Sequence, residues 1–296
     1  MKLIKPSFEI WNQPAGLEGV YKQIEGAGRV CYKSEDKIAE GTAKAFVDRM
    51  IASGHGAMLE HGTVYLKCKT EVINRYIHPE DGEEEDFNKL EKYEYNSYSV
   101  TNDDGIYLYV TTNLRVLVEN DWLDDLQYIC EPTEFHEKRI TVHFVCDRGV
   151  SHEFVRHRVF SFAQESTRYC NYSKDKFGNE LTFIQPCWLD DERLKLYGPY
   201  HTVIRDKSLE SIFIASLNNA EKDYIDLIDL GWKPQEARAV LPNSLKTELV
   251  VTGFVSDWNH FFDLRARGTT GAPHPQAKEL AEPLMKEFIA RKYINN

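Results

Sequence analysis

The feature that most constrains the fold is the segment 139–172, where an alternating strand leads into a dense group of arginines and aromatic residues. Residues 139–146 alternate between polar and apolar, which is typical of a strand with one face in a core. A turn at 147–149 separates this strand from a short helix expected over about 151–158. The fold therefore has to place charged side chains directly beside a buried strand.

The remaining segments also mix strands and helices. Alternation predicts strands at 63–69, 180–185 and 246–255, and an extended start followed by a helix at 107–117. Helical spacing of apolar residues predicts helices at 41–52, about 208–230, Pro234–Pro242, about 256–267 with Ser256 and Asp257 as caps, and about 275–293. The strands and helices do not alternate as in βαβ units, and neither GxGxxG nor GxxxxGK[ST] occurs. We therefore expect an α+β fold.

Composition narrows the classes of function. A net charge of −11 argues against a general nucleic-acid binder, which needs a basic face. The chain lacks an apolar run of the roughly 18 residues that cross a membrane, and its first residues lack the apolar region of a signal peptide. The six cysteines form no CxxC and no zinc-ligand spacing, so we expect reduced, mostly buried thiols and no metal. A soluble, cytoplasmic protein is the expectation.

One segment differs in composition from the rest of the chain. Residues 79–86 form an acidic run, a tyrosine-rich stretch follows, and a turn at 103–105 ends the segment. We interpret 79–105 as a surface insertion loop, with a partner-binding acidic hairpin as the alternative.

The candidate chemistry lies in the stretch DRGVSHEFVRHRVFSFAQESTRYCNY, residues 147–172. Arginine is the preferred bidentate ligand for phosphate and carboxylate. Arg156 and Arg158 are two positions apart and should point in different directions, with His157 pointing in a third, which suits a junction between two ligands. Ordinary surface ion pairs are the alternative, but the neighbouring aromatic residues favour partial burial, where unpaired arginines are costly.

These residues carry a resemblance to a known family. Arg156-His157-Arg158, followed after seven residues by Ser166 and then by Arg168-Tyr169, resembles the RHR-x7-S signature of flavin-dependent thymidylate synthases, the ThyX family. Leu59-Glu60-His61, the stretch from Arg238 to Pro242, and Leu264-Arg265 followed by His274 resemble further family segments. The resemblance implies one domain over 1–296, with a central, largely antiparallel sheet flanked by helices.

The resemblance also implies a reaction and its ligands. The family converts dUMP to dTMP as a methyltransferase: methylenetetrahydrofolate supplies the carbon, reduced FAD the hydride, and NADPH reduces the flavin. The implied dUMP ligands are Glu153, Arg156, Gln164, Glu165, Ser166, Thr167, Arg168, Arg238 and Arg265. The implied FAD ligands are Thr63, Arg156, His157, Arg158, Gln164 and His260. Arg265 matches the catalytic arginine, which stabilises negative charge on the uracil and cannot act as a base. The family also implies a homotetramer with sites built between subunits.

Several departures and alternatives stay open. The family often has glutamine where this chain has Glu153, and Asn-Glu where it has Ala163-Gln164. Ser166 could be a nucleophile, but no base stands at a fixed spacing from it, so we interpret it as a hydrogen-bonding ligand of dUMP. Cys170 is interpreted as a buried thiol. The rival functions are an inactive flavin- or nucleotide-binding relative and an RNA-binding module.

Overall fold

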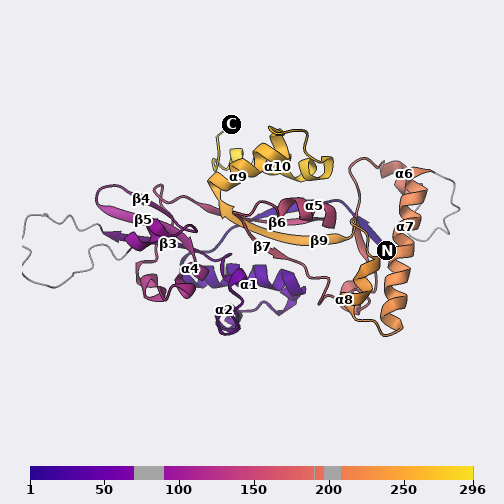
Figure 1. Cartoon of the computed structure of the whole chain (residues 1–296), viewed down its shortest axis with the longest axis horizontal. Helices are drawn as coiled ribbons and strands as arrows, with labels where there is room; N and C mark the ends of the chain where they lie inside the picture. The colour runs from indigo at the N-terminus through magenta and orange to yellow at the C-terminus, as the bar shows by residue number, and fades with distance from the viewer. Residues whose placement is uncertain (70–89, 190, 197–207, 296) are drawn as a thin grey trace, which may run out of the picture.

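The computed structural model describes residues 1–69, 90–189, 191–196 and 208–295 (Figure 1). Its strands are β1 (Lys2–Ile4), β2 (Ser7–Trp11), β3 (Thr63–Lys69), β4 (Val100–Asp103), β5 (Tyr107–Asn113), β6 (Arg139–Asp147), β7 (Ser161–Gln164), β8 (Thr182–Ile184) and β9 (Lys246–Phe254). They form a four-stranded sheet in the order β2-β6-β9-β7, a three-stranded sheet in the order β3-β5-β4, and the pair β1-β8. The first two sheets are antiparallel, which confirms the expected α+β class.

Helices cover both faces of the four-stranded sheet. They are α1 (Gly16–Tyr32), α2 (Thr42–Ala52), α3 (Gly56–Leu59), α4 (Leu114–Glu119), α5 (Arg148–Phe154), α6 (Asp191–Leu196), α7 (Leu209–Asp229), α8 (Pro234–Ala237), α9 (Val255–Phe262) and α10 (Pro275–Ala290). Short 3₁₀ turns are η1 (Glu35–Lys37), η2 (Glu91–Tyr95), η3 (Leu123–Tyr128), η4 (Asp175–Phe177) and η5 (Arg238–Val240), and η6 (Asp263–Arg267) is a π-helical turn. Among the described helices, none is both long and apolar enough to cross a bilayer.

The main core lies between the central sheet and the C-terminal helices. Alternate residues of β6 and β9, such as Phe144 and Val251, point to this side and pack against Trp258 of α9 and Phe288 of α10. The ring centroids of Trp258 and Phe288 are 5.4 Å apart. Figure 1 shows α9 and α10 over one face of the sheet and α1 beneath the other.

Helix α1 covers the opposite face, and the sequence patterns did not predict it. Its Ala27 and Val30 pack against Ala163 of β7 and Val250 of β9. The glycines of α1 explain why the helix was not predicted, because a glycine inside a helix is roughly 1 kcal/mol less favourable than an alanine. Gly28 allows close packing, since a Cβ there would lie 2.4 Å from the ring of Phe46.

The smaller antiparallel sheet corrects the interpretation of 79–105. Residues 79–89 lie outside the described part of the chain, and two side chains of 90–105 belong to a core. Leu90 and Tyr93 are fully buried among the residues of β3, β5 and α4. Strand β4 then pairs with β5, from Val100 opposite Thr111 onward. The surface-loop interpretation is therefore wrong for Leu90, Tyr93 and the paired strand β4, although the side chains from 94 to 105 are exposed or half-buried.

The other boundary predictions have mixed outcomes. The predicted strands and the long helices α2, α7 and α10 are present within a few residues of their expected ends. The short helix starts earlier than 151, because Asp147 caps it and accepts a hydrogen bond from the Val150 amide at 2.7 Å. The predicted cap at Ser256 and Asp257 is wrong: the capping position is Phe254, and its side chain makes no capping bond.

Candidate functional site

A cleft of about 850 Å³ opens beside the C-terminal end of α5. Three segments line it: the turn after α5, the helix α9 with η6, and the loop that leads into α10. The lining residues are Glu153, Arg156, His157, Arg158, Val159, His260, Leu264, Arg265, Thr270, Gly271, Ala272, Pro273 and His274. The structure therefore brings residues of the RHR motif together with Arg265, more than 100 positions later, as the resemblance implies.

Helix α5 holds one wall of the cleft in place. Asp147, at its N-terminus, accepts hydrogen bonds from the Val150 amide at 2.7 Å and from Gln276 of α10 at 2.6 Å. Burial raises the pKa of Asp147, and these two hydrogen bonds oppose that effect. The helix ends at Phe154, so Arg156 and Arg158 lie beyond it rather than on its last turn.

The π-helical turn η6 places Arg265 on the opposite wall. Its Nη1 donates to the Glu153 carboxylate at 2.6 Å and its Nη2 to the Glu153 carbonyl at 3.0 Å. Its Nε donates to Nε2 of His157 at 3.1 Å. We expected an α-helix through about residue 267, but the regular helix ends at Phe262 and widens at this point. Such local widening of a helix is frequent at functional sites.

His157 is the buried member of the RHR motif. It is 7% exposed, and its ring lies 5.0 Å from that of Phe261 and 6.2 Å from that of His260. Burial, with the nearby charge of Arg265, lowers the pKa of His157 to about 4. The neutral ring can therefore accept the hydrogen bond from Arg265 near neutral pH.

Arg156 and Arg158 differ from His157 in their exposure. Both are exposed at the cleft, and neither has an ion-pair partner among residues 1–69, 90–189, 191–196 and 208–295. The alternative that they form ordinary surface ion pairs is wrong for this part of the chain. Two unpaired guanidinium groups beside a cleft are suited to binding an anionic ligand.

A second polar group lies outside the cleft. Arg238 donates to the Thr167 hydroxyl at 3.2 Å, and Arg168 donates to Gln235 at 3.3 Å. The hydroxyl of Ser166 accepts from the Arg168 amide at 3.3 Å, and no histidine or carboxylate of the described residues bonds to it. This environment supports a ligand role for Ser166 over a nucleophile role.

Gln164 and Glu165 also lie away from the cleft lining. Gln164 donates to the hydroxyls of Ser151 at 2.9 Å and Thr247 at 3.2 Å. Glu165 is 2% exposed and accepts from Lys246 at 2.8 Å and from the Tyr172 hydroxyl at 3.0 Å. In this chain alone, both residues connect elements around β7. Cys170, 2% exposed, is a buried thiol as expected.

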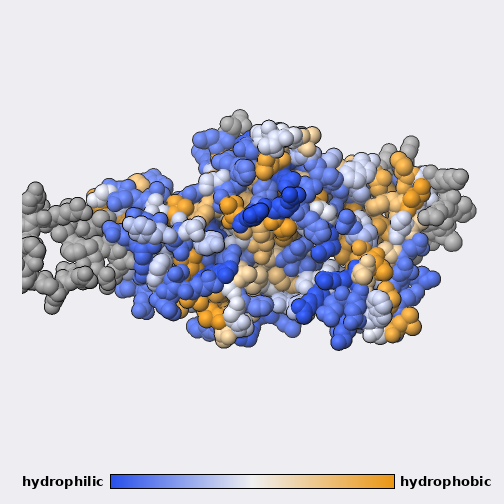
Figure 2. All heavy atoms as spheres, in the orientation of Figure 1, coloured by the Kyte–Doolittle hydropathy of each residue, from blue (hydrophilic) through white to orange (hydrophobic). Residues whose placement is uncertain are grey.

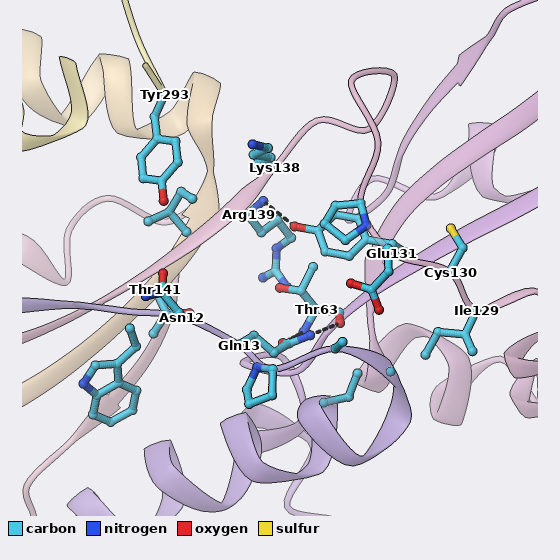
Figure 3. Close-up of a pocket in the computed structure, with 18 residues that line it drawn as sticks. Asn12, Gln13, Thr63, Ile129, Cys130, Glu131, Lys138, Arg139, Thr141 and Tyr293 are labelled. Carbon is cyan, nitrogen blue, oxygen red and sulfur yellow. Dashed lines mark hydrogen bonds between the residues drawn. The ribbon is translucent and has the colours of Figure 1, made fainter. Parts of the chain in front are cut away.

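Thr63 lies in a different and smaller cavity, of about 210 Å³. Figure 3 shows its main chain joined to the side-chain amide of Gln13, with Arg139 beside it: the Gln13 amide donates to the Thr63 carbonyl at 2.8 Å and accepts from the Thr63 amide at 2.9 Å. Arg139 is 9% exposed and donates to the Glu60 carbonyl at 2.9 Å, without a carboxylate partner among the described residues. Burial lowers the pKa of Arg139 to about 10.

Sequence reasoning missed Arg139 and the loop 270–273. Arg139 is the first residue of β6, and the alternation of that strand was used only to identify its apolar positions. The loop contains Gly271 and Pro273, which are turn residues, and it follows Arg265 within a few positions. These turn residues, so close to a predicted site arginine, were the signal that could have identified the loop as part of the site.

The sequence profile of the Thy1 family, described as "Thymidylate synthase complementing protein", matches residues 121–291. The match covers more than half of the 296 residues and includes every residue that lines the cleft. The chain belongs to this family. The antiparallel central sheet, the RHR motif and Arg265 therefore occur in a Thy1 family member, in agreement with the resemblance.

Individual relatives agree with this family assignment. A flavin-dependent thymidylate synthase of Pyrococcus furiosus is 32% identical over 149 residues, which are 50% of this chain and 53% of that one. The chain thus matches about half the length of this relative. A protein of the same name from Corynebacterium aurimucosum is 25% identical over 279 residues, covering 93% of this chain and 78% of that one. Among solved structures, the UMP/dUMP methylase PolB of Streptomyces cacaoi with 5-Br dUMP shares 17% identity, with a TM-score of 0.44, over 98% of this chain and 93% of that chain.

Proposed function

We propose that the protein is a flavin-dependent thymidylate synthase that methylates dUMP to dTMP. In this proposal methylenetetrahydrofolate supplies the carbon, and NADPH reduces a bound FAD. The observation that carries the proposal is the convergence of the RHR motif and Arg265 on one cleft in a Thy1 family chain. Two relatives whose names include that activity support it.

The cleft fits FAD in its size and in its donors. Its volume of about 850 Å³ is in the range of cofactor sites. Arg156 and Arg158 offer unpaired guanidinium groups for the oxygens of a diphosphate, and His260 adds a ring at the same wall. When bound and reduced, FAD supplies the hydride. The chain's own part is to hold and orient the ligands.

Arg265 has the central role toward the nucleotide in this proposal. Its guanidinium stays protonated, so it cannot remove a proton. It instead stabilises the negative charge that develops on the pyrimidine as C5 becomes nucleophilic. Arg168 and Arg238, with the hydroxyls of Ser166 and Thr167, provide the phosphate-binding group.

We further propose a homotetramer in which two copies complete each site. The phosphate-binding group and Thr63 do not line the cleft of their own chain, which supports a site completed by a second copy. Figure 2 shows hydrophobic residues gathered around α7, where Leu209 is 75% exposed and Leu230 82% exposed. Exposed apolar groups of this kind favour association between chains. Light scattering should give four copies, and a monomer at working concentration would contradict this assembly.

The first experiment is spectroscopic. The purified protein should be yellow, or become yellow on titration with FAD, and its visible absorbance should bleach when NADPH is added without oxygen. Tritium release from [5-³H]dUMP, dependent on methylenetetrahydrofolate, then tests the methylation itself. Failure to take up flavin would refute the enzyme, and flavin binding without tritium release would identify an inactive relative.

A further inference from the structure

The guanidinium of Arg265 is held on three sides before any ligand is present. Glu153 accepts one hydrogen bond through its carboxylate, at 2.6 Å, and a second through its main-chain carbonyl, at 3.0 Å. His157 accepts the third at 3.1 Å. Contacts to three different acceptors fix both the position and the plane of a guanidinium group.

The donors of Arg265 can be counted. A guanidinium carries five N–H groups, one on Nε and two on each terminal nitrogen. The three contacts use one N–H on each nitrogen. One N–H therefore remains on each terminal nitrogen of Arg265, and these are the groups available to a ligand in the cleft.

The carboxylate oxygen Oε2 and the main-chain carbonyl of Glu153 both accept from Arg265. Its side chain is 30% exposed and that of Arg265 is 18% exposed, so the ion pair is partly shielded from solvent. A free carboxylate at this position would repel the phosphate or an electron-rich ring of a nucleotide. Pairing with Arg265 neutralises the charge of the Glu153 carboxylate, which then orients the guanidinium group.

We propose that Glu153 is a positioning residue that acts on the substrate through Arg265 and does not itself bind dUMP. The identity of the substrate in this inference rests on the proposed function. The contact between Glu153 and Arg265 does not depend on that proposal. It also accounts for the acidic residue at a position where the family often has glutamine. A carboxylate holds a guanidinium more strongly than an amide oxygen does, because the hydrogen bond is charge-assisted at both ends.

The direct test measures how firmly Arg265 is held. Phenylglyoxal reacts with accessible guanidinium groups, and mass spectrometry of peptides resolves the rate at each arginine of the purified protein. Glu153→Ala should raise the rate at Arg265 at least fivefold, and Glu153→Gln should give an intermediate rate. Asp263→Ala is the matched control, because Asp263 pairs with Arg267 at 2.9 Å on the same turn. It should raise the rate at Arg267 and leave Arg265 unchanged.

Steady-state tritium release supplies the second readout. Glu153→Ala should lower kcat at least tenfold with less than a threefold change in the KM for dUMP, and Glu153→Gln should restore at least a third of the wild-type kcat. An unchanged phenylglyoxal rate at Arg265 in Glu153→Ala would overturn the inference, and so would a tenfold rise in KM at constant kcat. A wild-type protein without tritium release would refute the proposed function alone, because the labelling rates would still decide the role of Glu153.

Discussion

Replacing Arg265 with alanine separates a catalytic role from a structural one. The change removes all three hydrogen bonds of the guanidinium. Glu153 is 30% exposed on its side chain and can be solvated again, so its loss of a partner costs little. His157 is 7% exposed and keeps an unpaired Nε2, which costs about 1–3 kcal/mol. The expected loss of stability is therefore about 2 kcal/mol.

This loss is too small to explain a failure of turnover. A domain with a free energy of unfolding of about 5–15 kcal/mol keeps at least 3 kcal/mol after the substitution, so about 99% of it stays folded. The melting temperature of a 296-residue chain should fall by roughly 3 °C, from an unfolding entropy of about 2.1 cal/mol/K per residue. Removing a preorganised charged donor from the transition state, in contrast, lowers kcat by about 10²–10³-fold. The two effects differ by orders of magnitude and can be told apart.

The assay is tritium release from [5-³H]dUMP, with bound flavin measured by its visible absorbance. Arg267→Ala is the matched control, because Arg267 lies on the same turn, pairs with Asp263 and does not line the cleft. Arg265→Ala should keep its flavin and lose turnover, while Arg267→Ala keeps both. Turnover within threefold of wild type in Arg265→Ala would refute the assigned role, and loss of flavin would show that Arg265 holds the cofactor instead.

Further predictions concern the folded state. In α1, Gly19→Ala should lower the free energy of unfolding by about 3 kcal/mol or more, because its Cβ would lie 1.8 Å from the Pro14 carbonyl oxygen. Gly26→Ala meets only ordinary contacts and should raise the free energy of unfolding by about 1 kcal/mol. Urea unfolding measures both changes. The pKa of His157 is about 4 when folded and 6.5 otherwise, so the unfolded chain binds more protons between these values. Stability should fall as the pH drops from 6.5 to 4, and a His157→Gln variant should show a flatter thermal-stability profile. Asp147→Ala should cost about 2 kcal/mol and Asp147→Asn clearly less, since asparagine keeps an acceptor for the cap, and equal losses by calorimetry would contradict the capping argument.

The sequence predicted those parts of the structure that depend on local patterns. The strand 139–146, the helix of α7 and the polar segment around Arg156 are each readable from side chains close together in the chain. The π-helical turn around Arg265 was not predicted, because the apolar spacing of α9 continues through it. Residue types do not show which main-chain hydrogen bonds a helix forms. Helix α1 was missed for a related reason, since packing against β7 and β9 outweighs the low propensity of its glycines.

The candidate site was predicted as one group and is found as several. Sequence reasoning joined Thr63, Arg168 and Arg265 through a resemblance, which carries residue identities but no distances. Within one chain, Thr63 bonds to Gln13 in another cavity, and Arg168 bonds to Gln235 near α8. Where each group lies depends on long-range pairing of strands and on docking of helices, and neither is encoded in a short motif. In the proposed homotetramer, a second copy of the chain would bring these groups to one ligand.

The geometry of the cleft depends on α10, although α10 supplies no chemistry of its own. Gln276 in its first turn bonds to Asp147 at 2.6 Å and so holds the N-terminus of α5, which carries Glu153 on the cleft wall. The side chain of Phe288, farther along α10, packs on Phe262 at a centroid distance of 5.1 Å, immediately before the turn that carries Arg265. The same helix therefore fixes both partners of the Glu153–Arg265 pair. Because a displacement of about 1 Å is enough to break a 2.6 Å hydrogen bond, substitutions that loosen α10 should impair the cleft before they unfold the chain.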